Sequence, residues 1–506
     1  MPWYLVLLSI MGTQASAITF LSAPGQAYTD GMRFVQYYFG LPLAMIVICI
    51  FFVPVFKKLK VYTAYEFLET RFDVKTRTLT SGLFLISRGL STGISIYAPS
   101  IILSSLLGWN IYYTNLVMGG LLIIYTMSGG AKAVAYTQQL QLIIIIGGMF
   151  VAGYLVVNLL PAGVGFSEAL KMGGSQGKMN IITSGVTNNH FDWKDKYNIW
   201  SGVIGGFFLA LSYFGTDQSQ VGRYLTARSA KESKVGLLMN GLVKVPMQFL
   251  ILLLGVLVFS FYQYHKAPIY FDETKVVAAK KTIYEDSLIT IEQEYNTAMA
   301  QQNIPHLNEL RNDYKSVLKK ALPGEDTNDT NYIFLSFVVT TLPKGLVGLL
   351  IAVIFLAAWG SIAAALNSLA SCTVVDFHKK FINTNCSEAK DYSISRWYTF
   401  GWGVFCIIVA MFAQNIGNSL IEAVNILGSL FYGVILGIFL VAFWIKQVKG
   451  NAVFTAAVIA ELLIFLIYKL DIISFLWLNV IGALLVIIIS LLLQAILSGS
   501  KRIVST

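Results

Sequence analysis

Residues 4–25 read YLVLLSIMGTQASAITFLSAPG, an apolar stretch long enough to cross a bilayer that is interrupted by Gly12, the polar run TQAS and Pro24. A second apolar stretch, residues 198–222, is interrupted by two glycines and the segment SYFGTDQ (212–218). Glycine and proline are common in ordinary membrane helices, so a single break would favour only that simpler interpretation. Breaks at corresponding positions in two halves of a chain are typical of transporters, because the freed backbone groups bind ions and solutes near the membrane midplane.

The composition of the whole chain is that of a membrane protein. Of its 506 residues, 56% are hydrophobic and 12% are charged, whereas a soluble domain has about 25% charged residues. The mean hydropathy is +0.67. Hydropathy predicts about twelve spans, which lie at 4–25, 32–56, 78–106, 110–127, 132–160, 198–222, 234–264, 335–377, 395–414, 418–445, 451–468 and 472–497. We therefore expect an all-α polytopic membrane protein and exclude a soluble enzyme.

The net charge of +10 does not indicate nucleic acid. Lys and Arg collect in alternate loops between the spans, as cytoplasmic loops of membrane proteins do irrespective of function. The pattern predicts a multi-pass protein of the plasma (inner) membrane with both termini in the cytoplasm. The long polar insertion at 265–334 contains TIYEDSLITIEQEYNTAMAQQ (282–302), which predicts a small external helical hairpin. A lid or a docking surface would suit it, but an elaborated loop without direct function is the simpler interpretation.

The predicted eighth span contains FLAAWGSIAAALNSLASCTVVDF, residues 355–377. Its small residues permit close helix packing, which explains most of the alanines. Ser361, Ser368, Ser371 and Thr373 also place hydroxyls inside the span, where carbonyls of a broken helix would complete an oxygen cage for a hard cation such as sodium. A serine in a helix often bonds only its own i−4 carbonyl, so residue chemistry alone leaves packing and a cation site as alternatives.

Six motifs then occur in order: SAITFLSAPGQAY (16–28), VYTAYEFLETRF (61–72), STGISIYAPSIIL (91–103), YTMSGGAKAV (125–134), SYFGTDQSQVGRYL (212–225) and LNSLASCTVVDF (366–377). Together they resemble the sodium/solute symporter family over residues 3–450, and its iodide, monocarboxylate and vitamin branch more than its sugar branch. The resemblance implies a leucine-transporter-like fold with two inverted five-helix repeats, at 1–160 and 198–445. An external loop at 161–197 would separate them, and two C-terminal helices and a cytoplasmic tail would occupy 446–506.

The resemblance also implies a sodium site at the first break. Its ligands fall on the backbone carbonyls of Gly12, Ala15 and Ala357 and on the hydroxyl of Ser361. The family usually has two adjacent hydroxyl residues here, and Gly360 stands in place of the first, which removes one oxygen ligand.

A second sodium site of some relatives is not expected. Gln138 replaces its aspartate, and Ala363 and Ala364 replace its hydroxyl residues. We therefore expect Na+ to be the coupling ion and one ion at most.

A solute site is expected between the first, second, third, sixth and tenth spans. By resemblance its residues are Gln14, Ser16, Thr19, Phe20, Phe34, Tyr38, Ser91, Tyr213 and Asn425. Thr19, Tyr38 and Ala210 replace the amide and acid ligands of the sugar symporters, so a hexose is not expected. Tyr213 matches the aromatic residue that caps the solute, although interface packing would explain it equally well.

Arg88 is an ionisable residue inside a span, which costs about 2.5 kcal/mol or more unless it meets a cavity or a partner. It lies one helical turn from Ser91, where sialic-acid symporters would carry the arginine that binds the solute carboxylate. Arg88 is therefore a candidate solute ligand, the alternatives being a protein acid as partner or extension toward the cytoplasm. Asp217 poses the same question in the sixth span, and an ion pair with Arg223 is favoured over a proton-coupling role.

The sequence thus predicts a sodium-coupled secondary symporter that imports a small organic solute, an anion or monocarboxylate-like compound, by alternating access as a monomer. The alternative is a non-transporting membrane sensor or receptor that retains the fold, motivated by Gly360 and Gln138. An enzyme is not expected, because the chain shows no histidine cluster, nucleophile elbow, phosphate loop or paired intramembrane carboxylates.

Overall fold

The computed structural model describes residues 1–301, 304–382, 388–413 and 419–503, and side chains throughout these ranges except at 129–140, 304–305, 388–389 and 498–503. Within them, ten helices are long and apolar enough to cross a membrane, and the bent pair at the N-terminus would make an eleventh. A shorter apolar helix, Ser201–Thr216, follows in the second half. The predicted all-α polytopic architecture is therefore confirmed.

The first half of the chain contains, in order, α1 (Trp3–Gln14), α2 (Ala17–Asp30), η1 (Met32–Tyr38), α3 (Leu41–Val47), η2 (Ile48–Phe52), α4 (Val53–Leu59), α5 (Glu66–Arg71), α6 (Val74–Leu107), α7 (Ile111–Asn158), α8 (Phe166–Ser175), β1 (Val186–Thr187) and β2 (His190–Phe191). The second half contains η3 (Ser201–Gly205), α9 (Gly206–Thr216), α10 (Gln218–Leu225), α11 (Ala230–Tyr264), α12 (Glu273–Ala279), α13 (Glu285–Ala300), α14 (Ile304–Ala321), α15 (Thr330–Thr341), α16 (Lys344–Cys372), η4 (Thr373–Ile382), α17 (Glu388–Phe412), α18 (Leu420–Trp444), α19 (Gly450–Lys469) and α20 (Phe475–Ile503). The two short strands form an antiparallel hairpin.

The structure differs from the predicted spans in two places. The spans expected at 110–127 and 132–160 both lie in the single helix α7, in which Ile111–Ser128 and Gln141–Asn158 each have the length and apolarity of a span. The span expected at 335–377 is divided into α15 and α16, because Pro343 has no backbone N–H for the preceding helix and stands at the start of the next one.

Glycines allow the spanning helices to approach closely. A Cβ added at Gly255 of α11 would lie 2.1 Å from the carbonyl oxygen of Pro24 in α2. A Cβ added at Gly433 of α18 would lie 2.7 Å from the carbonyl oxygen of Leu478 in α20. Backbone contact of this kind is how helices associate where the hydrophobic effect does not drive them together. The packing holds α2, which carries part of the first break, firmly against α11.

One buried ion pair joins α6 to the segment after α16. Arg77 lies 2.6 Å from Asp376 of η4, whose side chain is fully buried. Ser81 and Thr63 also donate hydrogen bonds to the Asp376 carboxylate, at 2.9 Å each. Every oxygen of this carboxylate therefore has a partner, which marks the pair as structural.

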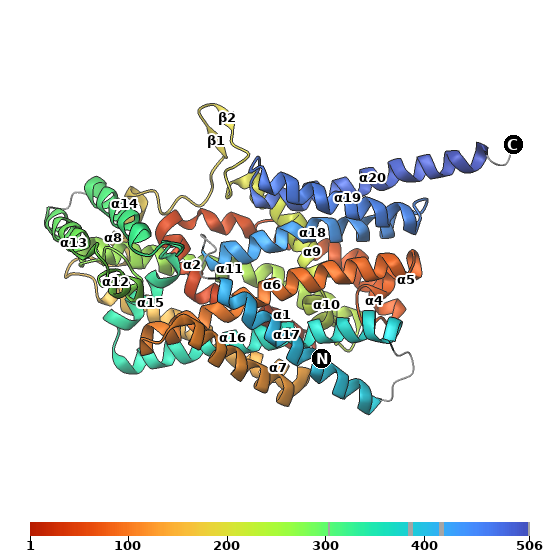
Figure 1. The fold of residues 1–506 in the computed structure, drawn as a ribbon, viewed down its shortest axis with the longest axis horizontal. Helices are drawn as coiled ribbons and strands as arrows, with labels where there is room; N and C mark the ends of the chain where they lie inside the picture. Colours follow the sequence, from red (N-terminus) through yellow and green to blue (C-terminus); the bar gives the residue numbers. More distant parts are fainter. Residues whose placement is uncertain (302–303, 383–387, 414–418, 504–506) are drawn as a thin grey trace.

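The polar insertion folds as α12, α13 and α14, which gather at one end of the molecule, while α4, α5 and the C-terminal end of α20 lie at the other (Figure 1). Helices α13 and α14 pack against each other around Tyr295, Leu310 and Tyr314. The helical hairpin expected in this region is therefore present.

Candidate functional site

The first break lies between α1 and α2, which meet at an angle of 62°. Ala15 leaves the helical region, at φ −79° and ψ 86°. The amide of Ser16 donates to the carbonyl of Gln14, and the amide of Thr19 donates to the carbonyl of Ser16, each at 3.0 Å. In an unbroken helix these two amides would bind the carbonyls of Gly12 and Ala15. Both carbonyls are thereby released from the helical pattern.

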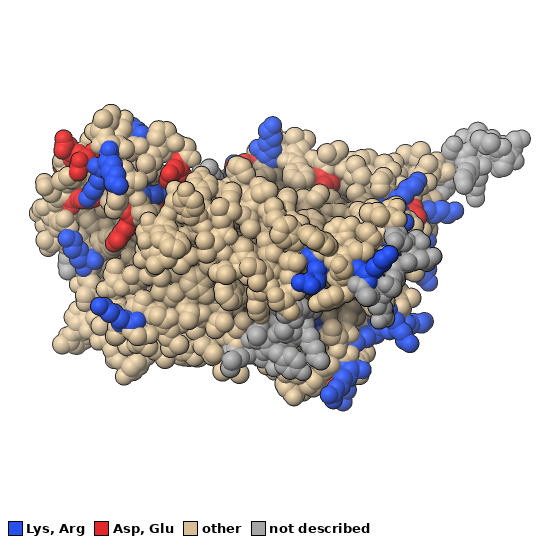
Figure 2. Space-filling model, turned by 60° about the horizontal axis from the view of Figure 1, so that its bottom comes forward, with Lys and Arg blue, Asp and Glu red and all other residues tan. Residues whose placement is uncertain are grey.

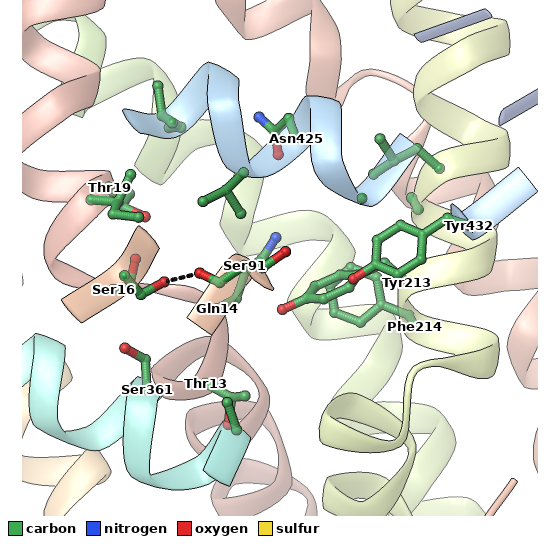
Figure 3. Close-up of a pocket in the computed structure, with 18 of the residues that line it drawn as sticks. Thr13, Gln14, Ser16, Thr19, Ser91, Tyr213, Phe214, Ser361, Asn425 and Tyr432 are labelled. Atoms are coloured by element: carbon green, nitrogen blue, oxygen red, sulfur yellow. Dashed lines mark hydrogen bonds between the residues drawn. The ribbon is translucent and has the colours of Figure 1, made fainter. Parts of the chain in front are cut away.

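Ser361 stands on α16 beside this break, near Thr13 and Ser16 (Figure 3). Its hydroxyl is buried and donates to the carbonyl of Ala357 at 3.0 Å, with the carbonyl of Ala358 at 3.1 Å. A hydroxyl that donates in this way keeps its lone pairs for a cation. Helices α1 and α16 pack together, so the four residues expected around sodium come from adjoining elements. The side chain of Gln138 lies outside the described residues.

The second break lies between α9 and α10, at Asp217, which adopts extended backbone angles. One carboxylate oxygen of Asp217 accepts from the amide and hydroxyl of Ser219, which caps α10, and the other accepts from the Tyr432 hydroxyl at 2.9 Å. The ion pair expected with Arg223 is not among the ion pairs of the described residues. That prediction is wrong, because a carboxylate at a helix start satisfies the free amides of its own helix first.

A cavity of about 120 Å³ lies between the two breaks. Residues of α1, α2, η1, α3, α6, α9, α11, α16 and α18 line it. Eight of the ten residues expected at a solute site are among them, namely Gln14, Ser16, Thr19, Tyr38, Arg88, Ser91, Tyr213 and Asn425. Phe20 and Phe34 lie outside it: Phe20 faces an apolar cavity beside α7 and α11, and Phe34 stacks on Tyr37 with ring centroids 5.7 Å apart.

Several polar atoms on the cavity wall have no hydrogen-bond partner among the described residues. They are Oε1 of Gln14, Nδ2 of Asn425 and Nε of Arg88. The Tyr37 hydroxyl donates to Oδ1 of Asn425 at 3.0 Å, which orients the amide so that its nitrogen is left over. A buried polar atom without a partner costs about 1–3 kcal/mol. The cavity thus offers two donors and one acceptor to a solute.

Two cations face the cavity, and their surroundings differ. Arg88 lies 6.0 Å from the ring centre of Tyr213, and the carboxylate of Asp217 acts on it electrostatically. Lys244 of α11 is 1% exposed and lies 5.6 Å from the ring centre of Tyr38. Among the described residues no carboxylate lies within ion-pair distance of its ammonium. Lys244 is therefore a buried lysine without a carboxylate partner among the described residues.

Two tyrosines, Tyr213 and Tyr432, also line the central cavity. Tyr213 and Tyr432 lie side by side with ring centroids 5.9 Å apart (Figure 3). Gln220 of α10 donates to the Tyr213 hydroxyl at 2.7 Å. Lys244, Tyr37 and Tyr432 also line the cavity but were not predicted from the sequence. A signal for Lys244 was available, since it is a lone lysine within the apolar run of α11.

Comparisons with known proteins agree with this architecture. A family model described as the sodium:solute symporter family matches residues 1–294 and 314–460. The sodium-dependent multivitamin transporter of Oryctolagus cuniculus is 28% identical over 442 residues, which are 86% of this chain and 58% of that protein. The sodium/sialic acid symporter SiaT of Proteus mirabilis (strain HI4320) is 24% identical over 506 residues, which are 99% of this chain and 89% of that protein.

A solved structure, described as the substrate-bound outward-open state of a Na+-coupled sialic acid symporter, is similar to this chain with a TM-score of 0.77. The identity is 23%, and the match covers 98% of this chain and 90% of the other. This likeness concerns the fold, and it confirms the expected leucine-transporter-like arrangement of two inverted five-helix repeats followed by C-terminal helices.

Proposed function

The chain belongs to the sodium:solute symporter family, and from this premise we propose that it is a sodium-coupled symporter that imports a small organic anion by alternating access. The observation that carries the anion is Lys244, a buried lysine on the wall of the central cavity. A charged lysine at the centre of a span costs at most about 2.5–3.5 kcal/mol, and less where it faces a cavity. A solute carboxylate would supply its missing counter-ion.

The charge balance of the cavity favours one negative charge on the solute. The carboxylate of Asp217 acts on Arg88, whereas no carboxylate of the described residues lies within ion-pair distance of Lys244. A monocarboxylate beside Lys244 would also accept from the free Nδ2 of Asn425 or Nε of Arg88. Its hydroxyl or amide group would donate to Oε1 of Gln14. The proposed solute is thus a small carboxylate with a hydrogen-bond donor, and Ser16, Thr19, Ser91 and Tyr213 complete the wall.

The coupling ion belongs at the first break. The carbonyls of Gly12 and Ala15 are released from helical hydrogen bonds, and Ser361 presents a buried hydroxyl close by. Carbonyl and hydroxyl oxygens are the ligands that hard cations prefer. With the carbonyl of Ala357 they supply four oxygens, which supports a single sodium ion moved together with the solute.

The distribution of charge supports the orientation. Figure 2 shows mainly Lys and Arg at the end that carries α4 and α5, and mixed acidic and basic residues at the end with the insertion. Basic residues mark the cytoplasmic side. We therefore place the insertion outside, both termini in the cytoplasm and the chain in the plasma (inner) membrane. We also propose that it functions as a monomer.

The test of this function is a thermal-unfolding screen of the purified protein against small carboxylates and their amide analogues, with sodium or with choline. We expect a carboxylate to stabilise the protein only when sodium is present. The concentration of carboxylate required should be less than a tenth of the concentration of its amide analogue that gives the same stabilisation. Equal stabilisation by carboxylate and amide would contradict the anion, and sodium-independent stabilisation would contradict the coupling.

A further inference from the structure

A second cavity, of about 570 Å³, lies where the insertion packs against the spans. Its walls come from α2, α8, α11, α13 and α14, and it shares no residue with the central cavity. Its volume is in the usual range for small-molecule sites, about 300–1,000 Å³. Thr29, Gln176 and Asn308 at its edge are exposed, so it opens to solution.

Two cations line this cavity. Arg311 of α14 donates to the carbonyl of Pro268 at 2.9 Å and to the Tyr295 hydroxyl at 3.2 Å, which leaves further guanidinium N–H groups. Lys178, just after α8, donates to the carbonyl of Thr29 at 2.5 Å. Among the described residues neither side chain forms an ion pair with a carboxylate.

The acid that acts on Arg311, Asp329, is already engaged. Asp329 pairs with Lys315 at 2.8 Å and accepts from the amide of Phe271 at 3.0 Å. Burial lowers the pKa of Lys178, since a charged group loses solvation there. Both cations are thus partly desolvated, and although Asp30 acts on Lys178 and Asp329 acts on Arg311, neither cation has a carboxylate within ion-pair distance among the described residues. An anion in the cavity would form charge-assisted hydrogen bonds with them.

The remaining wall is aromatic. Tyr28 meets Phe259 edge to face at 5.3 Å and Tyr262 at 6.2 Å. Lys178 lies 5.1 Å from the ring centre of Phe259, and Arg311 lies 5.7 Å from that of Tyr295. These aromatic residues line the cavity, and their rings can pack against a flat apolar body.

Much of one wall lies in a segment that the family model does not match. The family model leaves residues 295–313 unmatched. This gap contains five residues of the cavity, namely Tyr295, Met299, Leu307, Asn308 and Arg311. The opposite wall, from α2, α8 and α11, lies in the matched region. The cavity therefore lies between this unmatched segment and the matched spans.

We infer that this cavity is a second solute site that binds an organic monoanion with an aromatic body, with Arg311 and Lys178 as its charged ligands. The carboxylate lies against these two cations, and the ring lies among Tyr28, Phe259 and Tyr295. The site gives the insertion a binding role separate from the central cavity. It does not depend on which solute is transported.

Equilibrium binding of radiolabelled benzoate to the purified full chain in nanodiscs tests the site. Measurements use the Lys244→Met variant as well as wild type, so that binding at the central cavity is recognised separately. We expect saturable benzoate binding that persists in Lys244→Met and a Kd raised at least tenfold by Arg311→Gln. Benzamide, which has the same ring without the charge, should compete at least tenfold less well.

Lys320→Gln is the matched control, because Lys320 is an exposed cation on the same helix and lies outside the cavity. It should leave the Kd unchanged. Lys178→Gln provides an independent variant on the other wall and should also raise the Kd, even if loss of the Arg311 hydrogen bonds disturbs the insertion. Benzoate binding unchanged in both Gln variants, or competition by benzamide equal to benzoate, would overturn the inference. If the central cavity does not bind benzoate, wild type and Lys244→Met would instead have the same Kd for benzoate, and Arg311→Gln would still raise it.

Discussion

Replacing Lys244 by methionine should make the protein more stable and less able to bind its solute. Methionine keeps the length and apolar contacts of the side chain and removes the charge. Without solute, the substitution removes the cost of an unpaired lysine within a span, which is at most about 2.5–3.5 kcal/mol because the side chain faces a cavity. With solute, it removes a hydrogen bond to a charged group worth about 1.5–3 kcal/mol, which corresponds to a Kd raised about 10- to 150-fold.

Thermal unfolding followed by intrinsic fluorescence measures both effects, with and without the carboxylate identified by the stabilisation screen. Arg77→Met is the control, because Arg77 is a buried cation whose partner Asp376 would be left uncompensated. Breaking such a pair costs about 3–5 kcal/mol, so this variant should unfold at a lower temperature. A lower unfolding temperature in Lys244→Met, as in Arg77→Met, would contradict this role of Lys244. Wild-type affinity of Lys244→Met for the carboxylate would contradict it as well.

Three further outcomes are expected. Ser361→Ala should raise the sodium concentration for half-maximal uptake at least tenfold, whereas Ser368→Ala should not, because Ser368 bonds its own helix outside the cavity; equal effects would remove the case for this sodium site. Gly360→Ser should lower the half-maximal sodium concentration by restoring an oxygen ligand, and an unchanged value would show that the hydroxyl is not missed. Arg88→Lys should raise the Kd for the carboxylate more than that for its amide, since lysine cannot reproduce a bidentate contact, and equal changes would assign Arg88 to structure through Asp217.

The broken helices were predictable because their cause is local. Gly12 and the polar run after it cannot continue an apolar helix, and the structure ends α1 at Gln14. Asp217 was assigned the wrong partner for a reason that is also local. Its place before Gln218–Leu225 makes it a helix cap, and hydropathy does not register caps.

The cavity residues were predictable only in part. Tyr37 and Asn425 are 388 residues apart in sequence, and their hydrogen bond exists only because η1 and α18 meet across the fold. Lys244 was missed because a single charge hardly changes the mean hydropathy of a long apolar helix. Its significance depends on the absence of a nearby acid among the described residues, which is a property of packing.

Uptake of the identified carboxylate into proteoliposomes, driven by a sodium gradient, tests whether this protein is a sodium-coupled importer. Uptake should require sodium, rise with sodium at a Hill slope of about 1, stop when the gradient is removed and fall at least tenfold in Lys244→Met. Binding of the carboxylate without uptake would identify a sensor that retains the fold, and uptake independent of sodium or of Lys244 would contradict the proposed site.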